Sequence, residues 1–175
     1  MKFDEVFKGY DKFNKDWALA SAGSIEDFNG CTIGWGSLGS IWDSGGIRRI
    51  ITIYIHPARL TCKYLLKNDY FTISFFDNAD KEKLAYMGSH SGRDDKYKAE
   101  TAGLSPIEVG ESVGYEQASL TLLVKKHYQG QFTKEGLSDE IKDYYSKSSK
   151  IYPDFEGGWQ AHYVFVGEII EIKEN

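Results

Sequence analysis

The sequence predicts a mainly β protein, a closed or split antiparallel β-barrel with helical insertions. Two observations lead to this fold class. Several β-branched or aromatic runs, such as residues 48–55 (RRIITIYI) and 70–76 (YFTISFF), are bounded by turn-forming residues. The few helical segments fall between such runs without a regular βαβ alternation. Because 175 residues suffice for one substantial core, we expect a single domain over residues 1–175.

The individual elements follow from local patterning and from the residues that interrupt it. The expected strands cover 17–22, 31–38, 48–55, 70–76, an edge segment within 105–114, then 115–132 and 160–172. The expected helices cover 57–66, a segment that Asp77 or Asn78 caps and Gly88 ends, then 95–102 and 138–146, with loops at 42–46 and 147–158. The Asn29-Gly30 pair predicts a hairpin turn, and Gly167 predicts a β-bulge.

Composition excludes several classes of function. The net charge of -5 argues against a nucleic-acid surface, because proteins that neutralise phosphates usually carry basic stripes. The charged N-terminal segment predicts no signal peptide, and no apolar run is long enough to span a membrane. Cys31 and Cys62 lack metal-ligand spacing, so we expect a reducing, cytoplasmic location. The scattered histidines predict no metal site, and no nucleophilic catalytic motif is present.

A polar glycine turn is the first candidate binding element. It carries small donors and cations between two expected helices, at Ser89, His90, Ser91, Gly92, Arg93 and Lys96. Main-chain amides at a glycine turn and nearby cations both favour a phosphate. Arg59 and Thr61, at the start of the expected helix 57–66, add donors near a helix N-terminus. The alternative is a solvated turn together with a surface arginine.

The glycine-rich segment Asn29 to Gly36 (NGCTIGWG) is the second candidate. It overlaps a literal G-x-G-x-x-G match at residues 34–39, but no helix is expected after it, which excludes a dinucleotide-binding Rossmann unit. Strand glycines at positions 34 and 36 would leave main-chain groups uncovered, so that a flat heteroaromatic ring could approach them, with Trp35 at its side. The alternative is a barrel strand that needs glycines at a bend.

These segments, in this order, resemble the flavin reductase-like family of FMN-binding split barrels, which includes the flavoredoxins. The matching pieces are NGCTIGWGSLG, IYIHPARLTCKYLLKNDYFTISFF, LAYMGSHSGRDDKY and HYVFVGEIIEI, and they span about residues 17 to 172. The resemblance implies a homodimeric FMN-binding split barrel that holds FMN, or alternatively FAD, noncovalently. It implies a partner subunit that completes the pocket, with Trp159 or His162 as candidates to reach across.

The resemblance also implies a set of cofactor-binding residues. The flavin ring would be lined by Asn29, Cys31, Thr32, Ile33, Gly34 and Trp35. The phosphate would be surrounded by Arg59, Thr61, His90, Ser91, Gly92 and Lys96, with Ser74 nearby. Two positions depart from the family, which commonly has Met at Cys31 and Arg at His56. Loss of that arginine would leave more of the phosphate binding to Arg59 or Lys96.

The expected activity is that of an NAD(P)H:flavin oxidoreductase. The nicotinamide would pass hydride to N5 of the flavin, and the electrons would go on to an acceptor, without a side-chain acid or base. The alternative from another class is a flavoredoxin-like electron carrier with a redox partner protein, which the acidic charge balance would suit. A third possibility is a binding module on the same barrel without a cofactor.

Overall fold

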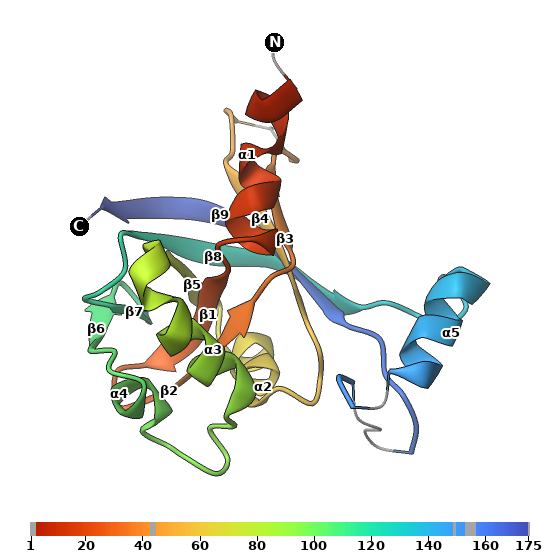
Figure 1. Cartoon of the computed structure of the whole chain (residues 1–175). Coiled ribbons are helices and arrows are strands. Elements are labelled where there is room, and N and C mark those ends of the chain that lie inside the picture. Colours follow the sequence, from red (N-terminus) through yellow and green to blue (C-terminus); the bar gives the residue numbers. More distant parts are fainter. Residues whose placement is uncertain (1–2, 43–44, 149, 153–156, 175) are drawn as a thin grey trace.

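A strongly curled antiparallel sheet forms the body of the molecule (Figure 1). The structure is a computed structural model that describes residues 3–42, 45–148, 150–152 and 157–174. Positions 43 and 44 of the predicted loop 42–46 therefore lie outside the described residues, as does Pro153 of the predicted loop 147–158. In the described part of the chain, no helix is long and apolar enough to cross a bilayer.

The sheet has seven strands in the order β2-β1-β5-β8-β9-β4-β3. The bounds are β1 Ala18–Ser24, β2 Asp27–Ile33, β3 Gly36–Gly39, β4 Ile50–Ile55, β5 Tyr70–Phe75, β8 Leu120–Gln131 and β9 Tyr163–Glu174. A separate hairpin pairs β6 Pro106–Val109 with β7 Ser112–Tyr115. Because β2 and β3 end the order without pairing to each other, the barrel is split between them. This confirms the predicted mainly β, split-barrel fold.

Helices cover the outside of the barrel and extend from it (Figure 1). They are α1 Phe3–Asn14, α2 Leu60–Lys67, the short 3-10 helix η1 Asn78–Asp80, α3 Lys81–Ser89, α4 Lys98–Thr101 and α5 Asp139–Lys147. Helix α5 projects at the end of the β8-β9 ribbon, at the right of the view, and α1 stands at the top. The side chain of Ser138 caps α5 by accepting from the Ile141 N–H.

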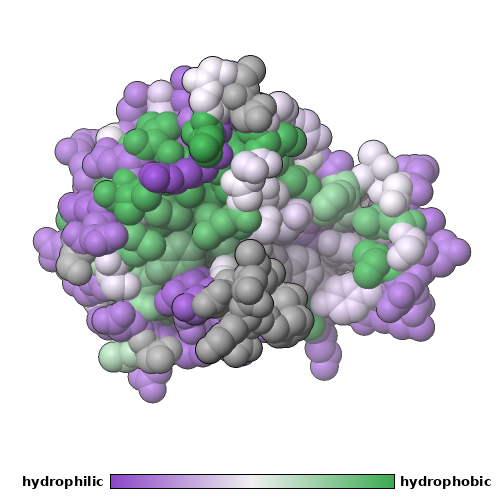
Figure 2. All heavy atoms as spheres, turned by 90° about the horizontal axis from the view of Figure 1, so that it is seen from above, coloured by the Kyte–Doolittle hydropathy of each residue, from purple (hydrophilic) through white to green (hydrophobic). Residues whose placement is uncertain are grey.

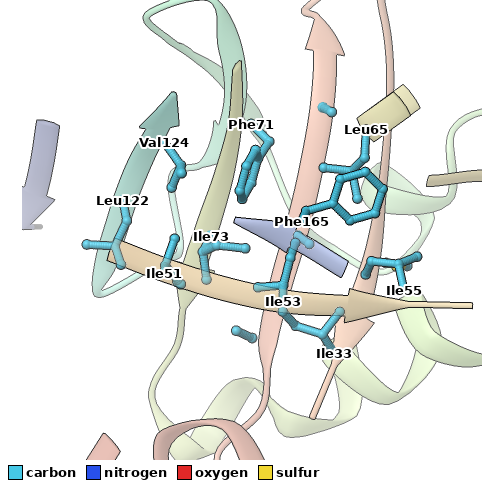
Figure 3. Packing of buried hydrophobic residues seen from close by; sticks show 14 of the residues in the cluster. Ile33, Ile51, Ile53, Ile55, Leu65, Phe71, Ile73, Leu122, Val124 and Phe165 are labelled. Carbon is cyan, nitrogen blue, oxygen red and sulfur yellow. The ribbon is translucent and has the colours of Figure 1, made fainter. Parts of the chain in front are cut away.

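Branched and aromatic side chains from the strands fill the barrel interior (Figure 3). Ile53, Phe71 and Phe165 are fully buried there, and Leu65 of α2 packs into the same cluster. A second cluster lies on the other face of β1, where Leu19 packs with residues of α3 and α4. Strand β1 is buried on both faces, which is why its sequence is small and apolar rather than alternating.

The predicted hairpin turn at Asn29-Gly30 is wrong. The turn lies at residues 25–26, and Gly30 pairs with Ser21 inside the β1-β2 ladder. A Cβ on residue 30 would lie 2.5 Å from the Ser21 hydroxyl and 2.5 Å from the Tyr115 hydroxyl. Gly30 therefore serves close packing inside the sheet, and not a turn conformation.

The glycines at positions 34 and 36 differ in role. The predicted strand 31–38 is broken between β2 and β3, with Gly34 and Trp35 in the break. A Cβ at Gly36 would lie 2.6 Å from the ring of Phe13, so this glycine is covered by α1. Helix α1 was not expected from the sequence, yet its Phe13 is buried in the core and meets Phe75 edge-on.

Smaller differences concern element ends. Helix α2 begins at Leu60, three residues after Pro57, and α3 continues one residue past Gly88. A β-bulge was predicted at Gly167. Next to the pairing of Gly167 with Lys126, the extra residue is His127 on β8, and the extra residue of β9 is Ile170. The other expected strands and helices are present within a few residues of their predicted bounds.

Candidate functional site

A cavity of about 500 Å³ lies beside the free edge of β2, a volume typical of small-molecule sites. Its walls come from β2, the start of α2, the segment from α3 to α4, and residues near position 151 and His162. Most of the predicted site residues line it, namely Asn29, Cys31, Thr32, Ile33, Gly34, Trp35, Arg59, Thr61, His90, Ser91 and Gly92. The fold thus gathers two segments that the sequence had marked separately.

The edge of β2 supplies main-chain groups to the cavity. Strand β2 pairs with β1 on one side, and no described strand pairs with its other side. The Thr32 side chain is turned away to donate a hydrogen bond to the Leu84 carbonyl of α3. Gly34 itself adds no side chain to this edge, and a Cβ there would lie 3.5 Å from the ring of Trp17, which packs on one side of it. This edge can form hydrogen bonds with a flat polar ring.

Asn29, Thr61 and Gly92 form one packed unit. The buried Thr61 hydroxyl donates to Asn29 Oδ1 at 2.7 Å, which joins β2 to the first turn of α2. A Cβ on residue 92 would lie 2.0 Å from Asn29 Nδ2, so glycine allows the turn to approach the asparagine. The unit fixes the distance between the β2 edge and the glycine turn.

Two arginines brace the segments around the cavity. Arg59 immediately precedes α2, and its guanidinium donates to the Gly88 carbonyl at the end of α3. Arg93 donates to the Ala58 carbonyl at 2.8 Å. Neither guanidinium lies in an ion pair with a described carboxylate. Arg59 therefore adds uncompensated positive charge to the cavity wall.

Lys98 is the cation that sequence reasoning missed. It is only 4% exposed, lines the cavity, and its Nζ donates to the carbonyls of Met87 (3.2 Å) and His90 (3.0 Å). Burial lowers the pKa of its ammonium group. No described carboxylate pairs with it. The sequence contained a signal for this lysine. Lys98 lies four residues before Ala102 in the expected helix 95–102, and residues four apart lie on the same face of a helix.

Two predicted site residues lie elsewhere. Lys96 is exposed, and its ammonium group lies 5.8 Å from the ring of Tyr97, outside the cavity wall. Ser74 is fully buried in β5, where its hydroxyl meets the Thr121 hydroxyl at 3.2 Å. The predicted turn thus lies at the cavity, but the lysine in its wall is Lys98 and not Lys96.

Another part of the cavity wall is aromatic. Trp35, Tyr152 and His162 pack together there, with ring centroids 4.7 Å apart for Trp35 and His162 and 5.0 Å for Tyr152 and His162. His56 adds a second imidazole, 5.3 Å from that of His162. We call the part of the wall with Arg59 and Lys98 the cationic end and this part the aromatic end, although the Arg59 charge acts on both imidazoles as well.

Both imidazoles at the aromatic end are kept uncharged. Burial lowers the pKa of His162 to about 3, with smaller contributions from His56 and the Arg59 charge. Burial also lowers the pKa of His56, although the Gln160 carbonyl partly opposes this. Nδ1 of His56 accepts from the Ala58 N–H at 3.2 Å, and its enclosed Nε2 forms no hydrogen bond within the described residues.

The residues present fit a planar ligand with an anionic tail. Lys98 is a buried cation without a carboxylate partner among the described residues, and a phosphate would supply the missing charge. The free β2 edge and the flat rings at the other end match a ring system with polar atoms on its rim. Binding of such a ligand requires neither a nucleophilic nor an acidic side chain in the cavity wall.

No protein-family model and no curated protein sequence matches the chain. Solved structures with similar folds include an FMN-binding protein from Thermus thermophilus with bound 1-cyclohex-2-enone, at TM-score 0.65 and 20% identity, over 94% of this chain and 73% of that one. Flavoredoxin of Desulfovibrio vulgaris (Miyazaki F) aligns at TM-score 0.63 and 17% identity, over 91% and 69%. The FMN-binding domain of a flavin reductases-like enzyme from Shewanella baltica aligns at 0.61 and 17%, over 94% and 72%.

These likenesses concern the fold. The structural neighbours are FMN-binding, flavin reductase-like split-barrel proteins and flavoredoxin, and this chain shares their architecture. The same fold class was expected from the sequence, and the resemblance stated there is confirmed at the level of architecture. The ligand of the cavity therefore has to be inferred from the residues that line it.

Proposed function

We propose that the protein binds FMN in the cavity beside β2 and acts as an NAD(P)H:flavin oxidoreductase. One observation carries the proposal: a single cavity joins an unpaired strand edge to a buried lysine without a carboxylate partner among the described residues. The FMN-binding proteins of the same fold support the choice of ligand. The flavin ring would lie along residues 29–35, and its phosphate near Lys98 and Arg59.

Each part of the wall has a role in this proposal. Lys98 and Arg59 would bind the phosphate, and the Asn29–Thr61 hydrogen bond would hold the β2 edge at a fixed distance from them. Main-chain N–H groups of residues 32–35 would stabilise negative charge on the ring. FMN, when bound, accepts hydride from NAD(P)H and passes electrons to an acceptor. The protein would therefore act by position and electrostatics.

A flavoredoxin-like electron carrier is the second candidate. Trp35 at the cavity is 44% exposed, which leaves an aromatic contact for a docking protein, and the net charge of -5 suits a basic partner. This protein would retain FMN and exchange electrons with proteins, with little direct NAD(P)H turnover. The two candidates share the site and differ in the electron donor.

An absorption spectrum with and without added FMN or FAD, followed by anaerobic NADPH and NADH, tests the proposal. We expect bound-flavin bands that bleach with one of the pyridine nucleotides. Flavin bands that persist with both nucleotides would favour the electron carrier. A protein that binds neither flavin would leave only the shared fold.

We further propose that the protein is a homodimer whose partner covers an apolar groove. Ile41, Trp42, Tyr128 and Val166 line this groove on the outer face of the sheet. Figure 2 shows hydrophobic side chains gathered on the face seen from above. Such patches on soluble proteins usually mark interaction surfaces. Sedimentation of Ile41→Asp, with Ile141→Asp on α5 as the control, should show dissociation only in the first variant.

The cellular location is part of the same proposal. Cys31 and Cys62 are both free and buried, which fits a reducing compartment, and we place the protein in the cytoplasm. Cell fractionation tests this placement. Recovery of the protein in a membrane or extracellular fraction would contradict it.

A further inference from the structure

Tyr145 of α5 contacts His162 through two hydrogen bonds. The Tyr145 hydroxyl meets Nδ1 of the His162 ring, and the backbone N–H of His162 donates to the same hydroxyl oxygen at 3.4 Å. Both side chains are 5% exposed. The Tyr145 ring is fixed from the other side by Trp159, which stacks on it at 5.2 Å with an interplanar angle of 6°. The hydroxyl therefore has a fixed position relative to the imidazole.

This geometry favours one tautomer of His162. If Nδ1 is unprotonated, the tyrosine donates its proton to Nδ1 while accepting from the backbone, so every group at the contact is satisfied. If Nδ1 carries the proton, the hydroxyl accepts twice, and its own proton has no other acceptor among the described residues. Leaving a buried donor without a partner costs about 1–3 kcal/mol. The proton of the neutral ring therefore belongs on Nε2.

Nε2 of His162 is then a donor without an acceptor in the described part of the chain, in a side chain that lines the cavity. The neighbouring His56 has the same arrangement, because its Nδ1 accepts from the Ala58 N–H and its Nε2 has no hydrogen-bond partner among those residues. The low pKa of His162 keeps its ring uncharged at physiological pH. The aromatic end thus offers neutral N–H donors next to the flat faces of Trp35 and Tyr152.

We propose that Tyr145 is a positioning residue whose hydroxyl holds His162 as an Nε2–H donor, and that this donor binds a carbonyl oxygen of an uncharged planar ligand. A neutral donor does not demand a negative charge, unlike the cations at the other end, and the aromatic walls match a planar ring. The inference deepens the proposed function, since it names the chemistry recognised at one end of the same cavity.

The imidazole nitrogen spectrum of His162 tests the tautomer directly. In two-bond ¹H–¹⁵N correlation spectra at pH 7, we expect Nε2 to have a protonated-nitrogen shift and Nδ1 an unprotonated one. Tyr145→Phe keeps the ring and removes the hydroxyl, so both shifts should move toward a tautomer average. Tyr144→Phe is the matched control, because Tyr144 is 42% exposed and its ring packs on Tyr145 and Tyr152 rather than on His162. A protonated Nδ1 in the unchanged protein would overturn the proposal.

Binding of a simple probe tests the ligand class. We expect benzamide, added to the protein as purified, to shift the Nε2–H signal of His162, and Tyr145→Phe to raise its dissociation constant about three- to tenfold. Equal binding of benzamide by both proteins, or an unmoved Nε2–H signal, would overturn the donor role. The tautomer measurement needs no flavin, so its outcome is separate from the success or failure of FMN binding.

Discussion

The two ends of the cavity are built in different ways. The cationic end is assembled from residues 59–61 and 88–98, two stretches whose small donors and cations predict anion binding. The aromatic end combines Trp35 between β2 and β3, His56 after β4, and Tyr152 and His162 between α5 and β9. One end carries charges, and the other carries two imidazoles that burial keeps neutral. The donors and cations of the first end can be read from local sequence, whereas the cluster of flat rings at the second depends on chain packing.

The largest effect is expected at the cationic end. Lys98→Met should raise the dissociation constant of FMN roughly 30- to 100-fold, because hydrogen bonds to a charged group contribute about 1.5–3 kcal/mol. Riboflavin, which lacks the phosphate, should lose much less affinity. Fluorescence titration with both flavins measures this difference. Lys96→Met is the matched control, since that side chain is exposed; an equal loss in both variants would contradict the assignment of Lys98.

The next effect concerns the packed unit of Asn29, Thr61 and Gly92, which fixes the β2 edge relative to the glycine turn. Gly92→Ala should destabilise the protein by about 2 kcal/mol, because the new Cβ would lie 2.0 Å from Asn29 Nδ2 and force it to shift. The FMN affinity should fall as well. Gly39→Ala, where a Cβ meets nothing within 4 Å, is the control. Urea unfolding compares the two variants, and equal stability of Gly92→Ala and the unchanged protein would show that the turn does not depend on this contact.

Burial of His162 at the aromatic end should make the stability of the protein fall at acid pH. The pKa of His162 is about 3 in the folded state and about 6.5 when unfolded, so below pH 6.5 the unfolded state binds a proton that the folded state does not. Stability should therefore fall with pH from 6.5 toward 3, by about 1 kcal/mol at pH 5.5 from this group. Urea unfolding of His162→Gln at pH 7 and 5.5 should show a smaller loss.

His127→Gln controls for that measurement, because His127 lies outside the cavity and contacts Glu168 on the surface of the β8-β9 ribbon. This variant should retain the contribution of the cavity imidazole to the acid sensitivity. If His162→Gln and His127→Gln reduced the acid sensitivity equally, burial of the cavity imidazole would not be its cause.

The smallest effect is expected at the hydrogen bond between the two segments. Thr61→Val keeps the side-chain shape but removes the donor to Asn29 Oδ1, and should lower stability by about 1 kcal/mol. Thermal unfolding measures the loss. Thr101→Val is a control, because its hydroxyl also forms hydrogen bonds but at the surface. If Thr61→Val unfolded at the same temperature as the unchanged protein, Asn29 would be held in place by packing alone.

The sequence predicted the strands and most cavity residues because their signals are local. Alternation and β-branching marked β4 and β5, and the small donors of residues 89–92 marked the turn. It mistook Gly30 for a turn residue, because Asn-Gly is a strong hairpin signal and the crowding by Ser21 and Tyr115 comes from other strands. It missed α1, whose Phe13 reaches the core only through tertiary packing.

The sequence by itself predicted the split-barrel class and marked segment 29–35 and the donor-rich turn 89–92 as candidate binding elements, since propensity, glycine placement and charge act over a few neighbouring residues. The tertiary structure decided that Lys98 rather than Lys96 enters the wall, and that His56, Tyr152 and His162 meet at the other end. The physical reason is burial: which side chain loses its water, and therefore which charge or proton it keeps, depends on the surfaces that pack against it.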